Sequence, residues 1–371
     1  MEILTTYKIP VGWLLGIVLL WLKVHAAWLF AAIRFFIGYC LDNTLYFLMH
    51  PPFIIPVLLV FIGTLTRTFI LRVILFFVLC LLVYIDYRWL DGTRPLAVTA
   101  IVMITVYVLF KWNLWQLSRT RFIMIVTIPL LGIIGRFWLE GLVSPYFVLI
   151  SILATLAWFI QERWSVVLLT ISGFTFVINQ GYWHDTMETL SILLWACVLC
   201  MGIGIPLGIF SAHRSRFYHF LQPILDLMQT LPAFVYLIPA LFFFRIGMTP
   251  GLIATLIFTL PTPIRLTQAS ISSTPSILLE SAQAFGANSW KLLWKVELPH
   301  ALPGICLSMT QTIMLSLSMV VITATVGGNG LGVKVYRALQ TGNVALGFEA
   351  GCVIVVVAIV LDRLFRPGKG H

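Results

Sequence analysis

Long apolar runs separated by short polar segments make up most of this chain of 371 residues. A helix that crosses a bilayer needs about 20 predominantly apolar residues in succession, and fewer where the bilayer thins. By this measure we predict about 10–11 membrane-spanning helices. They fall somewhere in 10–66 and at 68–86, 96–117, 121–137, 145–160, 165–180, 188–210, 220–243, 250–269, 302–325 and 344–362. The pattern predicts an all-α integral membrane protein, a polytopic helical bundle.

Composition supports this class. Hydrophobic residues form 60% of the chain and charged residues only 10%, whereas a soluble domain carries about 25% charged residues. The net charge of +10 could suggest a nucleic-acid partner. The basic residues, however, are spread over short clusters between the apolar runs, as the positive-inside rule predicts for a membrane protein. We therefore expect no nucleic acid among the partners.

One polar segment, 271–300, is longer than the other interruptions of the apolar pattern. Placing it in the cytoplasm also places there four loops that carry arginine, at 67–72, 118–121, 161–164 and 211–219. The segments 138–144 and 179–187 then fall outside and carry no excess of Lys or Arg. The loop at 86–95 departs from this rule because it contains two arginines.

Within this segment the sequence predicts two short helices joined by a turn. Pro275 suits the first turn of a helix, where a missing N–H costs nothing. Gly286 interrupts the pattern, and Ser289 can cap a second helix. We expect Leu298 and Pro299 to end that helix, because a residue before proline is displaced from helical geometry. The product is a helical hairpin that stands away from the membrane.

The spacing of this hairpin resembles the EAA coupling loop of ABC importer permeases. The matching residues are Glu280-Ser281-Ala282, Gly286, Val296 and Leu298-Pro299. The commonest form of the motif has alanine where this chain has Ser281, which is a mild change. The resemblance implies that the hairpin meets the ATPase of a partner chain. The residues that it implies for this contact are Glu280, Ser281, Ala282, Phe285, Gly286, Leu298 and Pro299.

From about 186 to 364 the chain is similar to the permeases of glycine betaine/proline-type (quaternary ammonium) ABC importers. The segments that carry this similarity are 204–208, 225–239, 261–266, 280–287, 311–312, 317–322 and 327–332. The resemblance implies a type I ABC importer permease core in a bacterial inner (cytoplasmic) membrane. It implies as partners a second permease subunit, in a homodimer, a cytoplasmic ABC ATPase dimer and an extracytoplasmic substrate-binding protein. The solute would be glycine betaine, proline betaine, choline or proline, and ATP and Mg would bind to the ATPase, with no cofactor on this chain.

The expected domain organisation has four parts. Residues 1–120 supply extra transmembrane helices and 121–186 supply lead-in transmembrane helices. The permease core covers 187–364, with the coupling loop at 271–300, and 365–371 form a cytoplasmic tail. The long apolar stretch at the amino terminus departs from the family pattern, which has a soluble or lightly inserted region there.

Broken membrane helices are the best indication of a translocation path, since irregular backbone in a membrane is tolerated where it lines a cavity. Prolines interrupt two predicted spans, and polar residues lie at similar depth. The candidates for the path are Gln229, Pro232, Tyr236, Pro239, Pro261, Gln311, Ser316, Ser318 and Thr323. Each could instead serve helix packing. Arg265 lies near the cytoplasmic end of its span, where we expect it to reach the lipid headgroups.

Other functional classes fit less well. No His-Glu-x-x-His or Gly-x-Ser-x-Gly pattern occurs, so we expect no catalytic residues and no enzyme activity in this chain. The seven histidines are dispersed and the cysteines lie in apolar runs, so we expect no metal site. The alternative is an ion-coupled secondary transporter of small amines without an ATPase, but such transporters tend to carry carboxylates inside the membrane. Asp and Glu total only 13.

Overall fold

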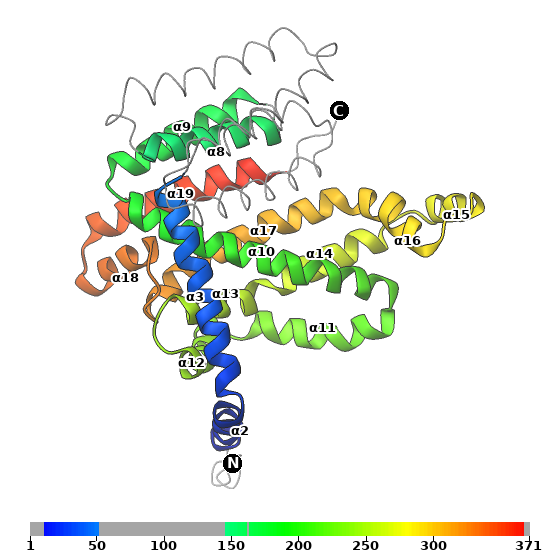
Figure 1. Cartoon of the computed structure of the whole chain (residues 1–371), viewed down its shortest axis with the longest axis horizontal. Coiled ribbons are helices and arrows are strands. Elements are labelled where there is room, and N and C mark those ends of the chain that lie inside the picture. Colours follow the sequence, from blue (N-terminus) through cyan, green and yellow to red (C-terminus); the bar gives the residue numbers. More distant parts are fainter. Residues whose placement is uncertain (1–10, 52–144, 162, 367–371) are drawn as a thin grey trace, which may run out of the picture. The chain divides into compact units, whose positions relative to one another are not determined.

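The computed structural model describes residues 11–51, 145–161 and 163–366, and all regular elements within them are helices. The predicted spans at 68–86, 96–117 and 121–137 lie outside the described residues, as do residues 52–66 of the region 10–66. The helices are α2 (Val11–His25), α3 (Ala27–Met49), α8 (Pro145–Gln161), α9 (Trp164–Asn179), α10 (Trp183–His213), α11 (Ser215–Thr230), α12 (Ala233–Phe244), α13 (Met248–Thr259), α14 (Pro261–Ser272), α15 (Ser276–Ala284), α16 (Ser289–Leu292), the π-helical η2 (Leu293–Glu297), α17 (Leu298–Ala324), α18 (Leu331–Thr341) and α19 (Val344–Phe365) (Figure 1).

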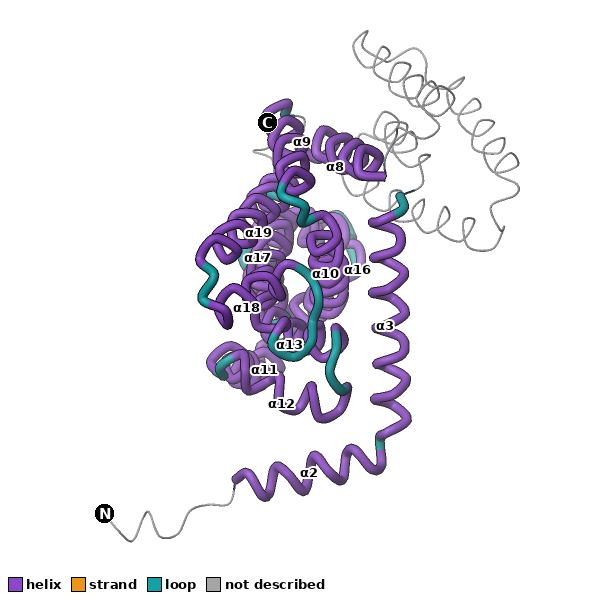
Figure 2. Tube along the Cα trace, turned by 90° about the vertical axis from the view of Figure 1, so that its left-hand side faces the viewer, coloured by secondary structure: helices purple, strands orange, loops and turns teal. Residues whose placement is uncertain are grey.

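Three helices of the described part are long and apolar enough to cross a membrane: Trp183–His213, Ser289–Ala324 and Val344–Phe365. Two bent pairs raise this to five if each pair is one span. One of them joins α2 to α3 at 80° (Figure 2). The expected all-helical membrane architecture is confirmed.

The other bent pair lies where the sequence predicts one span, over 220–243, that prolines interrupt. There α11 and α12 meet at 95°. The break falls at Leu231 and Pro232, whose backbones are extended (ψ 134° and 136°). A residue before proline avoids the helical region, and Pro232 supplies no N–H to the preceding turn. Pro239, by contrast, lies inside α12.

The described chain forms two compact units. One contains the described residues of Met1–Asn43 together with His184–Ile354. Within it the shorter helix α14 packs against the long helices α10 and α17 (Figure 1). The other contains the described residues of Thr44–Trp183 together with Val355–His371.

Glycines set how closely α10 approaches α14. A Cβ atom on Gly204 would lie 2.7 Å from Pro263 Cγ, and one on Gly208 would lie 2.6 Å from Thr267 Cβ. Both distances are shorter than real Cβ atoms show, so only glycine permits this approach. The Gly204-x-x-x-Gly208 spacing thus serves helix packing, as small residues do in membrane proteins.

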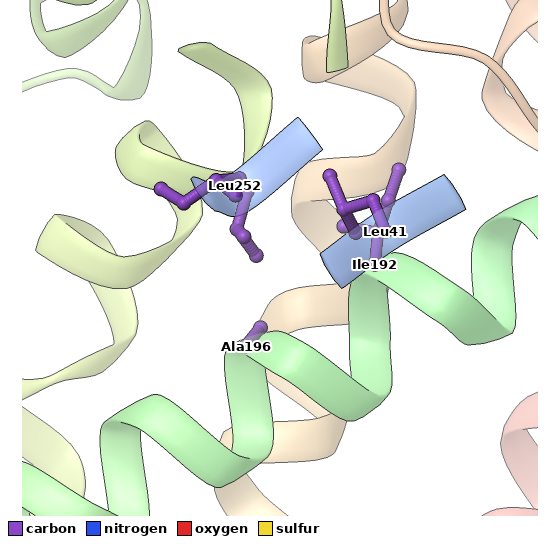
Figure 3. Packing of buried hydrophobic residues seen from close by; sticks show 5 residues of the cluster. Leu41, Ile192, Ala196 and Leu252 are labelled. Carbon is purple, nitrogen blue, oxygen red and sulfur yellow. The ribbon is translucent and has the colours of Figure 1, made fainter. Parts of the chain in front are cut away.

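The amino-terminal helix α3 packs on the same unit. Leu41 joins Ile192 and Ala196 of α10 and Leu252 of α13 in one buried cluster (Figure 3). Two hydrogen bonds reinforce this contact: Ser191 Oγ donates to the carbonyl of Leu41 at 3.0 Å, and Trp195 Nε1 donates to that of Cys40 at 3.2 Å. Part of the predicted amino-terminal region therefore shares a core with the predicted permease core, although the division at 120 itself stays a prediction.

The second unit pairs α8 and α9 with the last part of α19. Ala157, Val167 and Leu364 are buried together. Gly173 of α9 lies against Val356 and Val360. These helices correspond to the spans that the sequence predicts at 145–160, 165–180 and 344–362.

The close contact at Gly208 leads to a stability prediction. Gly208→Ala places a Cβ 2.8 Å from the carbonyl oxygen of Ile264, and forcing extra atoms into a packed core costs about 1–3 kcal/mol. We expect the apparent Tm in detergent to fall by several degrees. The matched control is Gly202→Ala on the same helix, where nothing lies within 4 Å and alanine improves helix propensity. An equal Tm in both variants would contradict the packing role of Gly208.

Candidate functional site: the exposed hairpin and the broken helices

The polar segment forms the helical hairpin that the sequence predicts, between α14 and α17 (Figure 1). None of the residues of α15 or α16 is buried. Large apolar side chains are nevertheless displayed there: Phe285 is 92% exposed, Ile277 73% and Trp290 65%. Exposed apolar side chains gathered on one element are typical of a surface that meets another protein.

Gly286 makes the turn of the hairpin. Its φ of 76° lies in the left-handed region, which glycine adopts without cost. The N–H of Gly286 donates to the Gln283 carbonyl at 2.8 Å, and the N–H of Ala287 donates to that of Ala282 at 3.1 Å. These bonds close α15 as a glycine commonly closes a helix. No neighbour lies within 4 Å of a Cβ at Gly286, so backbone conformation rather than crowding requires glycine within this chain.

The cap of the second helix differs from the sequence prediction. Asn288, not Ser289, caps it: Asn288 has an extended backbone (φ −78°, ψ 168°) and its side chain accepts from the N–H of Lys291 at 2.9 Å. Ser289 is already the first helical residue. Asparagine ranks with serine as a capping residue, so position along the backbone decided between them.

Leu298 and Pro299 do not end the helix, which corrects a second expectation. Helical backbone runs without a break from Ser289 to Ala324. The turn before Pro299 is the π-helix η2. A proline inside a helix removes one hydrogen bond and crowds the carbonyl four residues earlier, and a wider turn at that place relieves both effects. The hairpin is consequently one continuous helix with the membrane-length segment that follows it.

We call η2 and the first turn of α17 the neck of the hairpin. Glu297 in the neck is only 6% exposed. Its Oε2 lies 2.9 Å from Nε2 of His213, at the end of α10. The other ring nitrogen of His213, Nδ1, lies 2.9 Å from the carbonyl oxygen of Ile209. The approach lacks hydrogen-bond geometry, because Oε2 is buried without a hydrogen-bond partner among the described residues, but it sets the neck against the end of α10.

The predicted coupling residues separate into two places. Glu280, Ser281, Phe285 and Gly286 are exposed, and Ala282 is half-buried, all on the hairpin. Leu298 and Pro299 lie in the neck, where Leu298 is half-buried. The hydroxyl of Ser281 donates to the Ile277 carbonyl at 2.6 Å, which leaves the side chain folded against its own helix. Their role in coupling stays a prediction.

The predicted path residues also separate. Tyr236, Pro261, Ser316 and Thr323 are buried within the unit. The Tyr236 hydroxyl donates to the Met228 carbonyl and lies 3.3 Å from that of Leu227, so it holds the bend between α11 and α12. Gln229, Pro232, Gln311 and Ser318 are exposed, and Pro239 is half-buried. Whether any of them meets solute stays a prediction.

Sequence reasoning missed an ion pair between α11 and α14. Arg265 was expected to reach lipid headgroups, but its Nη2 lies 2.5 Å from Oδ1 of Asp226. One turn away, Gln229 Nε2 donates to Thr262 Oγ1 at 3.5 Å. The signal in the sequence was the spacing of Asp226 and Gln229, which repeats at helical intervals with His219 and Gln222 on one face of α11.

At the opposite end of α10, the glycine-rich segment 327–332 is fixed by polar contacts. Asn329 Nδ2 donates to Glu188 Oε1 at 3.1 Å, and the N–H of Leu331 donates to Thr189 Oγ1 at 2.9 Å. Gly330 has φ 101°, and a Cβ there would lie 2.5 Å from Thr189 Oγ1. This arrangement fits a structural turn. The amphipathic helix α18 that follows it was not predicted.

Comparison with known proteins agrees with this geometry. Residues 204–366 match the family described as "Binding-protein-dependent transport system inner membrane component". The chain is 44% identical over 225 residues (61% of this chain, 79% of the relative) to the glycine betaine transport system permease protein OpuAB of Bacillus subtilis. It is 40% identical over 246 residues (66% of this chain, 87% of the relative) to the glycine betaine/carnitine transport permease protein GbuB of Listeria monocytogenes.

Two further proteins complete the comparison. The chain is 40% identical over 239 residues (64% of this chain, 67% of the relative) to the glycine betaine/proline betaine permease ProW of Escherichia coli. A structure of the MetNI methionine ABC transporter in an inward-facing conformation aligns with 48% of this chain and 91% of its own, at 22% identity and a TM-score of 0.45. On the strength of the family match and the first two relatives, this chain belongs to the binding-protein-dependent transport system inner membrane components, the permease subunits of ABC importers.

Proposed function

We propose that this permease carries a small zwitterionic or quaternary ammonium solute, such as glycine betaine, proline betaine, choline or proline. The named transport functions of OpuAB, GbuB and ProW support this solute class. A separate extracytoplasmic binding protein would deliver the solute, as the description of the family implies. The permease would act as a homodimer, with the solute path between or within the two copies.

The observation that carries the coupling part of the proposal is the exposed hairpin. On it, Phe285, Trp290 and Ile277 are each at least 65% exposed. A helical element that displays apolar side chains is suited to dock in a groove of another protein. We infer that the groove belongs to a cytoplasmic ABC ATPase dimer, which binds ATP and Mg while this chain binds neither.

The neck gives the hairpin a mechanical connection to the membrane helices. Helical backbone is continuous from Ser289 into α17, and Glu297 contacts His213 of α10. A displacement of the hairpin by the ATPase would thus move α17 and α10 together. Closure of two ATPase subunits on ATP would in this way switch the solute path between outward-facing and inward-facing states.

The first experiment is copurification. We expect an ABC ATPase to copurify with the tagged chain from its native membrane, because the hairpin displays its apolar residues to the partner. In a Phe285→Asp, Trp290→Asp variant the ATPase should be lost, while expression and membrane insertion are unchanged. The matched control is Leu339→Asp, an exposed apolar residue outside both the hairpin and the membrane-length helices (72% exposed). Retention of the ATPase by the hairpin variant would contradict the proposed contact.

Gly286 gives a test of the turn. We expect Gly286→Val to lower uptake at least tenfold, because a β-branched residue is strained at φ 76°. Gly286→Asn should retain most of the uptake, since asparagine tolerates this region better than other residues. Radiolabelled solute uptake in proteoliposomes measures both. Normal uptake by the valine variant would show that the turn is not required.

Glu297 gives a test of the neck. We expect Glu297→Ala to lower the solute transported per ATP hydrolysed several-fold while the ATPase stays bound, because the neck loses its contact with α10. His213→Ala should reproduce the effect, and the double variant should be no worse than either single one. Lys295→Gln, at an exposed neck position, is the control. Full coupling in Glu297→Ala would remove the His213–Glu297 contact from the mechanism.

A further inference from the structure

One face of α11 is polar over its whole length. His219, Gln222, Asp226 and Gln229 follow at intervals of three and four residues and are all exposed, so they share one face of the helix. The large apolar residues Phe220 (70% exposed) and Leu227 (57% exposed) lie on a different part of the same helix. The helix thus separates a polar surface from a lipid-compatible one.

The exposed face of α14 is polar as well. Arg265, Gln268 and Ser272 recur at i, i+3 and i+7, and Gln268 Nε2 donates to Ser272 Oγ at 3.1 Å. The buried face of the same helix contains Ile264 and Ile271. The exposed face of α14 therefore lacks the large apolar side chains that contact with lipid tails would require.

The two polar faces adjoin. The helices α11 and α14 pack on each other (Figure 1), and the Asp226–Arg265 ion pair and the Gln229–Thr262 hydrogen bond join them. We call the combined surface the polar stripe. Its residues are His219, Gln222, Asp226, Gln229, Arg265, Gln268 and Ser272.

Asp226 and Arg265 of the polar stripe lie within two membrane spans that the sequence predicts, at 220–243 and 250–269. Arg265 lies seven residues before Ser272, the last residue of α14 before the hairpin, and a helix rises 1.5 Å per residue, so the ion pair is about 10 Å above that end. Charged side chains inside a membrane protein face a water-filled cavity or another part of the protein rather than lipid. Asp226 is nevertheless 52% exposed and Arg265 31%, so the described residues leave both partly uncovered.

We propose that the polar stripe lines the solute path and that Asp226 and Arg265 form a transient binding site for a zwitterion. The carboxylate of the solute binds Arg265 and its cationic group lies against Asp226. Arg265 has five N–H donors; only Nη2 contacts Asp226, and Nε is buried without a partner among the described residues. An exposed ion pair is weak, so it can open to accept a solute that carries both charges. This site rests on the solute class proposed above.

Thiol accessibility tests the lining of the path without reference to the solute. In proteoliposomes that contain the permease with its ATPase and binding protein, we expect Gln222→Cys and Gln268→Cys to react with a membrane-impermeant trimethylammonium methanethiosulfonate at least ten times faster than Leu227→Cys. Wild-type protein gives the reactivity of the native cysteines. A rate equal to that of Leu227→Cys would overturn the proposal.

Transport tests the ion pair. We expect Asp226→Asn and Arg265→Gln each to lower glycine betaine uptake at least tenfold, with ATP hydrolysis stimulated by the binding protein within twofold of wild type. The exchanged pair, Asp226→Arg with Arg265→Asp, restores the contact between the helices but reverses the two charges along the path. Uptake should stay low in this variant, whereas full recovery would reduce the pair to a structural contact and overturn the proposed site.

The two tests separate the inference from the proposed function. If the wild-type complex takes up no betaine, the solute proposal fails, yet the accessibility rates still decide whether the polar stripe lines a path. If wild-type uptake is normal and the two single variants also transport normally, the solute proposal stands and the zwitterion site fails.

Discussion

The close packing of α14 between α10 and α17 is the interaction on which the rest of the described permease core depends. Glycines make it possible on both sides: Gly208 of α10 lies against Thr267, and Gly304 of α17 lies against Ser270. The hairpin lies in the chain between α14 and α17, so the packing of these two helices on each other fixes the position of its base. Without a hydrophobic driving force between helices in lipid, close approach at small residues is what holds them together.

Rigidity of the hairpin follows from the same arrangement. Gly286 fixes the turn through its backbone conformation, and the π-helical neck lets helical backbone pass Pro299 into α17. A flexible tether would absorb the movement of a partner, whereas a continuous helix transmits it. The buried Glu297 adds a second connection, to α10. The proposed function requires this property, because under it the energy source would lie on another chain, a cytoplasmic ATPase.

Some polar groups in this unit bond within their own helix, and others lie together on one surface. The hydroxyls of Thr255 and Thr259 donate to carbonyls of their own helix. The polar side chains of α11 and of the exposed face of α14 lie instead on adjoining surfaces of the two helices, and they include the Asp226–Arg265 ion pair. In a chain with 10% charged residues, such a concentration of polarity contrasts with the apolar faces around it.

The sequence by itself determined the class of the protein, the places of most helices and the hairpin, because apolar length, turn residues and the spacing around Gly286 are local properties. It could also indicate that Pro232 interrupts a helix. Only the tertiary structure decided that Asn288 rather than Ser289 caps, that the helix continues through Pro299, that Tyr236 is buried at a bend and that Arg265 meets Asp226 rather than lipid. Each of these features depends on contacts between distant segments or on how a neighbouring turn adjusts its hydrogen bonds. The spacing of residues along one helix determines neither the contacts nor the turn geometry.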